Sequence, residues 1–158
     1  MNGHTQLSGL SPLLCEERSQ LRDFVSALKR EQEVLIAGEI DRLTPVLEEK
    51  SRLAADLGKL LDRRNQILAS AGVKTDKFGM EAWLAGQPPA IRADWESLLA
   101  LSREARLQNE INGNLIQTRM EHNQQALSVL QVASKQTLLY GPDGQSLPGS
   151  GGRHFDSA

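Results

Sequence analysis

The chain has 158 residues, of which 39% are hydrophobic and 4% aromatic, and this indicates one domain without a thick aromatic core. Its 18 lysines and arginines against 20 aspartates and glutamates give a net charge of −2, which excludes a polybasic surface for nucleic acid or for an anionic membrane. The single cysteine excludes an intrachain disulfide, and the absence of a signal-peptide pattern or of an apolar run of about 18 residues predicts a soluble, cytoplasmic protein.

The first long helix is predicted to begin at Ser11–Pro12 and to end before Gly72. Serine is a good N-cap, proline is tolerated at the first helical position, and glycine often follows a helix end. Apolar residues recur at every seventh position in two sets that are 11 residues apart, a step that keeps them on one side of a helix. The sets are Leu7, Leu14, Leu21, Leu28 and Leu35, then Val46, Leu53, Leu60 and Ile67.

Gly38 and Pro45 interrupt this helical pattern. A proline inside a helix removes one backbone hydrogen bond and costs about 3 kcal/mol. Two interpretations compete: a break near residues 38–44 with Thr44 as a new N-cap, or one long helix that is kinked near Pro45. Because the apolar seam keeps its phase through this region, the kinked helix is favoured.

A linker with a short helical piece at residues 80–84 follows, and Gly86–Pro89 stops and restarts the chain. Trp83 and Trp95 flank this turn and are expected to be core residues. A second long helix is predicted from about Pro89 to Leu139, and its length matches that of a continuous first helix. The sequence therefore predicts an all-α fold, an elongated antiparallel hairpin or bundle of two long helices with a short linking helix.

The domain organisation follows from these elements. We expect residues 1–140 to form a single helical domain. Residues 141–158 are rich in glycine, proline and serine, so they are expected to be a flexible C-terminal tail.

Catalytic and metal-binding patterns are absent from the sequence. The histidines are His4, His122 and His154. None lies at ligand spacing from a second histidine or a cysteine, and no glycine-rich phosphate loop occurs. Cys15 lacks the context of a nucleophile and is expected to pack as a small apolar residue. Runs that include Glu31 and Lys50 are typical of a solvated helix face. We expect no enzyme activity, no cofactor, no metal and no small-molecule substrate.

The second helix is polar where leucine would normally pack. Its rows of every seventh residue place Asn109, Asn112, Arg119 and Asn123 on the seam. A buried asparagine in a helical seam costs stability but fixes register and partner choice. These residues either cross-bond within the hairpin, which is the favoured interpretation, or line a groove for another chain.

The end of the second helix is apolar on nearly every side. Its apolar residues are Ala126, Leu127, Val129, Leu130, Val132, Ala133, Leu138 and Leu139. One antiparallel neighbour covers only one face of a helix, and a helix that is apolar all round is expected to be buried. A second copy, the folded-back tail or a partner protein must therefore cover the remainder.

This combination of features resembles the FlgN family of bacterial flagellar export chaperones. The resemblance covers about residues 7–145. It rests on the leucine-rich first helix, the tryptophan-containing hinge, the stretch Asn109–Ile116 (NEINGNLI) and the ending Leu138–Gly144 (LLYGPDG).

The resemblance implies a cytoplasmic chaperone of type III secretion that binds the hook–filament junction proteins FlgK and FlgL. In that family the C-terminal part of the chaperone holds the amphipathic C-terminal segment of the substrate. We expect the binding energy to come mainly from four leucines, Leu127, Leu130, Leu138 and Leu139. A tyrosine near the end of the last helix docks on the cytosolic domain of the export gate FlhA, which implies this role for Tyr140, the only tyrosine.

The alternative class is a non-enzymatic coiled-coil adaptor or dimerisation module. It would use the same apolar residues at 126–139 to bind a second copy of itself. The sequence leaves open whether a homodimer forms and dissociates when a partner binds.

Overall fold

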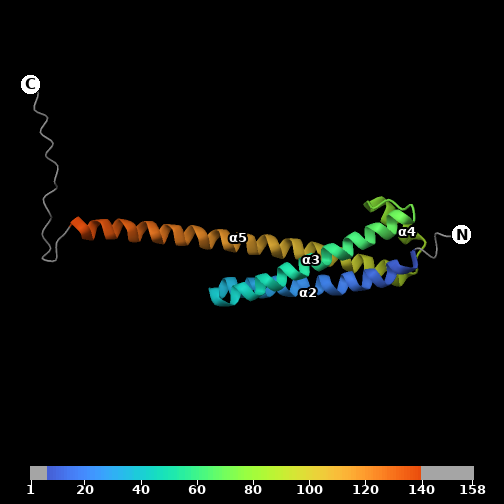
Figure 1. Cartoon of the computed structure of the whole chain (residues 1–158), viewed down its shortest axis with the longest axis horizontal. Helices are drawn as coiled ribbons and strands as arrows, with labels where there is room; N and C mark the ends of the chain where they lie inside the picture. The colour runs from blue at the N-terminus through green and yellow to red at the C-terminus, as the bar shows by residue number, and fades with distance from the viewer. Residues whose placement is uncertain (1–6, 140–158) are drawn as a thin grey trace, which may run out of the picture. The chain divides into compact units, whose positions relative to one another are not determined.

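The structure is a computed structural model that describes residues 7–139. These residues form one short 3-10 helix and four α-helices, without a strand, which confirms the predicted all-α class (Figure 1). The chain divides into two units, Met1–Ile116 and Gln117–Ala158, and the division falls within the last helix. Tyr140 and the expected tail at 141–158 lie outside the described residues.

The first unit begins with η1 (Leu7–Gly9), which leads into α2 (Leu10–Ala37). Helix α2 starts at Leu10 with Gly9 at the N-cap, so the prediction of a start at Ser11–Pro12 is wrong by a few residues. The leucines at every seventh position of α2 lie in the core as the pattern requires. They are Leu14, Leu21, Leu28 and Leu35, all at most 8% exposed.

The chain then reverses at Gly38–Glu39, so the predicted single kinked helix is wrong. Gly38 has φ of 74°, and the N–H groups of Gly38 and Glu39 both donate to the Val34 carbonyl oxygen, at 3.0 and 3.2 Å. This left-handed glycine ends α2, as glycine commonly does after a helix. Pro45 lies inside the next helix, α3 (Ile40–Ser70), whose N-cap is Glu39 and not Thr44.

Helix α3 returns antiparallel along α2. Ion pairs join Arg30 to Glu49 and Glu17 to Arg64, so residue numbers rise on one helix as they fall on the other. The seven-residue repeat of apolar residues continues from α2 into α3, because α3 must also place its apolar residues against the neighbouring helix. The 11-residue step therefore fits a reversal as well as it fits a kink.

Helix α4 (Lys77–Ala85) contains the short helical piece that the sequence predicts. Its N-cap is Asp76, whose Oδ1 accepts a hydrogen bond of 2.8 Å from the Gly79 N–H. Helix α5 (Pro89–Leu139) is one continuous helix of 51 residues with the predicted bounds. No helix within residues 7–139 combines the length and the apolar character that crossing a membrane requires.

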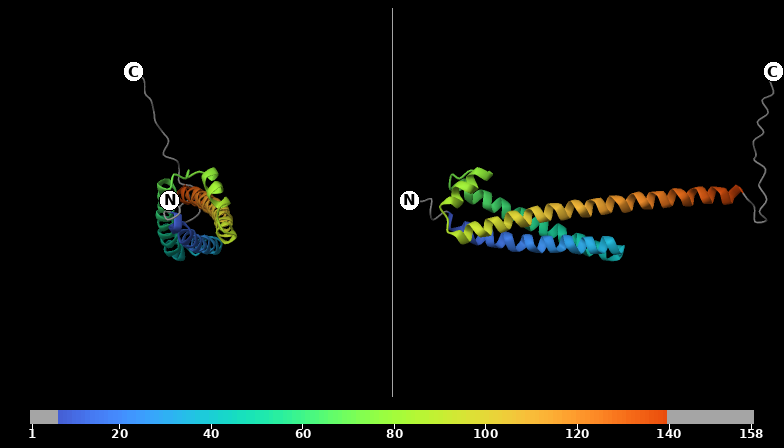
Figure 2. Two further views of the ribbon diagram at one scale, coloured as in Figure 1. Left: turned by 90° about the vertical axis from the view of Figure 1, so that its right-hand side faces the viewer. Right: turned by 180° about the vertical axis from the view of Figure 1, so that it is seen from behind.

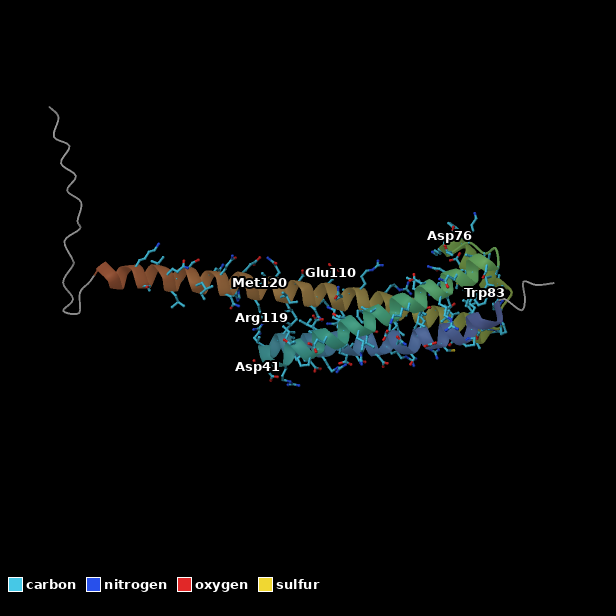
Figure 3. The ribbon with its side chains drawn as sticks, viewed as in Figure 1. Asp41, Asp76, Trp83, Glu110, Arg119 and Met120 are labelled. Atoms are coloured by element: carbon cyan, nitrogen blue, oxygen red, sulfur yellow. The ribbon has the colours of Figure 1, made fainter. Side chains whose placement is uncertain are left out.

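In the first unit α5 runs parallel to α2. Lys29 pairs with Glu104 at 2.7 Å, and Arg18 pairs with Asp94. The helices α2, α3 and the first part of α5 thus form a three-helix bundle, with α4 across one end (Figure 2). Trp83 of α4 is 8% exposed and belongs to the core that closes this end (Figure 3).

Candidate functional site

A buried polar layer joins the three long helices of the first unit. Asn112 Nδ2 on α5 donates to Glu31 Oε2 and to the Leu28 carbonyl oxygen on α2, both at 2.8 Å. Lys50 Nζ on α3 donates to the two oxygens of the same carboxylate at 3.0 and 3.3 Å. Glu31 is 0% exposed and Asn112 1%, so their buried polar groups depend on hydrogen-bond partners inside the bundle. Such a layer fixes the register of the three helices.

The four predicted seam residues do not share this environment. Asn112 cross-bonds within the bundle, as the favoured interpretation expects, and Gln108 Nε2 donates to its Oδ1 at 3.1 Å. Asn109 and Asn123 are exposed, and Arg119 is half-buried. The structure thus brings one of the four into the core and leaves the other three outside it.

A second buried ion pair lies nearer the α4 end of the bundle. Arg64 Nη1 donates to Glu17 Oε1 at 2.6 Å, and the guanidinium carbon lies 5.2 Å from the centre of the Trp95 ring. Burial raises the pKa of Glu17 above its ordinary value, and the charge and hydrogen bond of Arg64 oppose that shift. Trp95 and Arg64 come from α5 and α3, so this cluster also ties three helices together.

Sequence reasoning missed both buried glutamates. Glu31 and Lys50 were expected on a solvated face, and this is wrong because their charges are paired inside the bundle. The partners of Glu17 and Glu31 lie 19 to 81 positions away in the chain. No local pattern carries that information. The only sequence feature that indicates their burial is that both glutamates lie on the same face of α2 as the leucines at every seventh position.

Cys15 is exposed, so the prediction that it packs as an apolar residue is wrong. Its Sγ lies 3.4 Å from Asp94 Oδ2, and this hydrogen bond is the main cause that raises the pKa of the thiol. A raised pKa keeps the thiol protonated, which is the opposite of nucleophile activation. Within residues 7–139 the structure gathers no group of three or more side chains of metal-ligating type.

The second unit provides the candidate site. Its described part is a single helix, residues 117–139 of α5, which we call the α5 extension; Met120 is labelled near its start (Figure 3). Every side chain of residues 117–135 is exposed except that of Arg119, which is half-buried. The exposed fractions of its large apolar side chains are 60% for Met120, 58% for Leu127, 68% for Val129, 64% for Leu130 and 57% for Val132.

Large exposed apolar side chains on one short stretch mark an interaction surface rather than an ordinary solvated helix. Ser128, Val129, Val132 and Ala133 line a shallow apolar hollow on it. An exposed apolar helix surface of this kind can bind an amphipathic helix of another protein. Leu138 and Leu139 belong to the helix, but the structure does not describe their side chains, and Tyr140 follows outside the described residues.

Comparison with known proteins gives one family. The chain matches the family described as "FlgN protein" over residues 1–148. The flagella synthesis protein FlgN of Proteus mirabilis is 34% identical over 131 residues, 81% of this chain and 83% of the relative. FlgN of Salmonella typhimurium is 32% identical over 143 residues (89% and 91%), and FlgN of Yersinia enterocolitica 31% over 135 residues (84% and 86%). No solved structure matches the chain significantly.

Proposed function

The chain belongs to the FlgN family, and we propose that it is a flagellar export chaperone that holds an unassembled flagellar protein on its α5 extension. The proposed substrates are the C-terminal helical segments of the junction proteins FlgK and FlgL. The proposed chaperone acts in the cytoplasm and delivers these substrates to the cytosolic domain of the export gate FlhA. The relatives are named as flagella synthesis proteins, which supports a role in this process, and the exposed apolar helix supports the chaperone role.

The observation that carries the proposal is the exposure of Leu127 and Leu130, at 58% and 64%. Fully burying an aliphatic side chain contributes about 1.5–3 kcal/mol, and part of this is offset by ordering the partner. A segment that is disordered before binding and helical afterwards provides the apolar stripe that such residues need. Leu138 and Leu139 extend the proposed surface toward the end of the helix.

The direct test of this proposal compares two charge pairs on the same helix. Leu127→Asp with Leu130→Asp should lower the affinity for purified C-terminal segments of FlgK and FlgL by at least about a hundredfold, measured by calorimetry. Gln125→Asp with Ser128→Asp adds the same charge at exposed polar positions on the other side of the helix and is the matched control. Equal affinity of the two variants would show that the leucines do not hold the substrate.

The gate-docking role of Tyr140 is a separate proposal. Tyr140→Ala should leave the melting temperature and the affinity for the FlgK segment nearly unchanged but weaken binding to the cytosolic domain of FlhA. A tyrosine at a helix end keeps an apolar ring and a hydroxyl available to a partner. If Tyr140→Ala instead loses substrate binding, gate binding and thermal stability together, the tyrosine is structural and this division of tasks is wrong.

A coiled-coil adaptor is the second candidate function, because the same exposed apolar residues can bind a second copy. Light scattering at low micromolar concentration, with and without the FlgK segment, separates the two candidates. The chaperone proposal expects a complex whose mass includes the segment. A stable dimer whose mass the segment does not change would favour the adaptor.

A further inference from the structure

Helix α4 carries an apolar face that the bundle does not cover. Phe78, Ala82 and Ala85 are spaced by four and then three residues, so they lie on one side of the helix, and all three are exposed. We call these three residues the outer face of α4. The opposite side of α4 packs into the core through Met80 and Trp83. Phe78 is 77% exposed, the highest value among the large hydrophobic side chains described within residues 7–139, which marks the outer face as an interaction surface.

An apolar hollow of about 450 Å³ lies beside Phe78, which is part of its lining together with Gly79, Ala82 and Trp83. The wall of the hollow is tightly built, since a Cβ at Gly79 would lie only 1.9 Å from the Lys74 carbonyl oxygen of the preceding linker. Gly79 and Ala82 have small or no side chains. They therefore leave room that a bulky side chain of another molecule can fill.

A large exposed side chain next to such a hollow makes this surface self-complementary. In a contact with a twofold axis the same patch occurs on both molecules, so Phe78 of each copy can enter the hollow of the other. An antiparallel pairing of two α4 helices can place Phe78 opposite Ala82 of the second copy. A large residue opposite a small one lets two helices pack closely, and it brings the Phe78 ring next to the Trp83 indole that lines the hollow.

The charges beside the outer face fit the same pairing. Lys77 and Glu81 are both exposed and form an ion pair of 3.8 Å within α4. When Phe78 lies opposite Ala82 of an antiparallel copy, Lys77 lies opposite residue 83 of that copy, two residues or about 3 Å along the axis from Glu81. Each lysine then lies near a glutamate of the other copy. A parallel pairing would instead place Lys77 beside Lys77, so the charges favour the antiparallel contact.

We propose that the outer face of α4 binds the same face of a second copy in an antiparallel, twofold contact, with Phe78 of each copy in the hollow of the other. The contact lies on the first unit and does not depend on the proposed function of the α5 extension. It is weak, because α4 has nine residues, whereas a stable interface takes about 20–30 residues from each side.

The test measures self-association by sedimentation equilibrium from about 1 μM to about 1 mM. All proteins are full-length and carry Leu127→Asp with Leu130→Asp, which removes association through the α5 extension. Phe78→Asp alters the outer face, and an acidic residue in the first turn is favourable, so this variant keeps α4. Leu107→Asp is the matched control, because Leu107 is a large apolar side chain that is 59% exposed on α5. Melting curves check that both variants fold.

We expect the chain with an unaltered α4 to dimerise within this range. Phe78→Asp should raise the dissociation constant at least about tenfold, whereas Leu107→Asp should leave it within about twofold. A chain with an unaltered α4 that stays monomeric at the highest concentration overturns the inference. An equal effect of the two substitutions overturns it as well.

A second experiment tests whether the two outer faces meet each other. Lys77→Glu gives a copy with two acidic residues beside the face, and Glu81→Lys gives a copy with two basic ones. Each variant alone should dimerise at least about threefold more weakly, because like charges then meet. An equimolar mixture should dimerise about as well as the chain with an unaltered α4. A mixture that associates no better than either variant alone would show that α4 does not pair with α4.

Discussion

Glu31 has no exposed surface, and its carboxylate is held by Lys50 of α3 and Asn112 of α5. Leucine in place of a seam asparagine ordinarily stabilises a helical bundle. Here the same change removes one of the donors of a buried carboxylate, and an unsatisfied buried polar group costs about 1–3 kcal/mol. Whether replacing an asparagine by leucine stabilises or destabilises the bundle therefore depends on the hydrogen-bond partners of that asparagine.

Replacing Asn112 by leucine should lower the free energy of unfolding by about 1–3 kcal/mol, because Glu31 and the Leu28 carbonyl oxygen both lose a donor. Asn109→Leu, one turn earlier at an exposed position, should change it by less than about 0.5 kcal/mol. Urea unfolding of both variants measures the difference. A more stable Asn112→Leu variant would show that the polar layer does not support the bundle.

Glu17 gives the bundle a pH dependence. Because burial raises its pKa above the ordinary value of 4.5, the folded state takes up this proton at a higher pH than the unfolded state. The stability contributed by protonated Glu17 is thus present at low pH and is lost as the pH rises through the folded-state pKa. Relative to Glu17→Gln, the unaltered chain should lose stability as the pH rises from the ordinary glutamate pKa of 4.5 through the higher pKa of Glu17 in the folded state.

Urea unfolding across that pH range measures this difference. Glu16→Gln is the matched control, since it removes one negative charge from the exposed neighbouring position. If the unaltered chain gains stability relative to Glu17→Gln as the pH rises, the ion pair with Arg64 outweighs the burial of the carboxylate.

At the scale of elements, the corner between α2 and α3 depends on Gly38. Its φ of 74° lies in the left-handed region, where a side chain costs about 1–2 kcal/mol. Gly58 contrasts with it, because it lies inside α3 and a Cβ there would meet nothing within 4 Å. The same substitution should therefore have opposite effects at the two glycines.

Gly38→Ala should lower the free energy of unfolding by about 1–2 kcal/mol. Gly58→Ala should raise it by about 0.5–1 kcal/mol, because alanine loses less backbone entropy in a helix. Chemical denaturation of the two variants in parallel checks both signs. A stabilising Gly38→Ala would mean that the chain does not reverse at this residue.

The helices could be predicted from the sequence because their signals are local. The leucines of α2 at every seventh residue, Gly72 after α3 and the proline at the start of α5 all act within a few residues. The reversal at Gly38 was missed because the apolar phase is the same for a kink and for a returning helix. The burial of Glu17 and Glu31 was missed because their partners are distant in sequence.

The candidate site was predictable in part. Leu127 and Leu130 stood out because the apolar residues of 126–139 point to nearly every side of the helix, and the structure exposes both leucines. Asn109 and Asn123 are exposed and do not lie in a buried seam. A heptad row predicts which residues share one face of a helix, but it does not predict whether another helix covers that face. The partner's identity came from family resemblance and not from any spacing of residues.

At the scale of the whole molecule, the two units differ in how their apolar residues are used. The bundle covers its leucines with its own helices, whereas the α5 extension has large apolar side chains that are more than half exposed. Helix α5 has 51 residues, against 28 in α2 and 31 in α3. The central claim is that a partner protein covers the α5 extension and leaves the bundle unchanged.

Amide hydrogen exchange of the full-length chain, with and without the purified FlgK segment, tests this claim most directly. The backbone of an uncovered helix opens readily, and burial of its apolar faces should slow its exchange. We expect the segment to slow exchange within residues 117–139 and to leave exchange of residues 10–116 unchanged. Slowed exchange confined to α2 or α3, with none in the α5 extension, would contradict it.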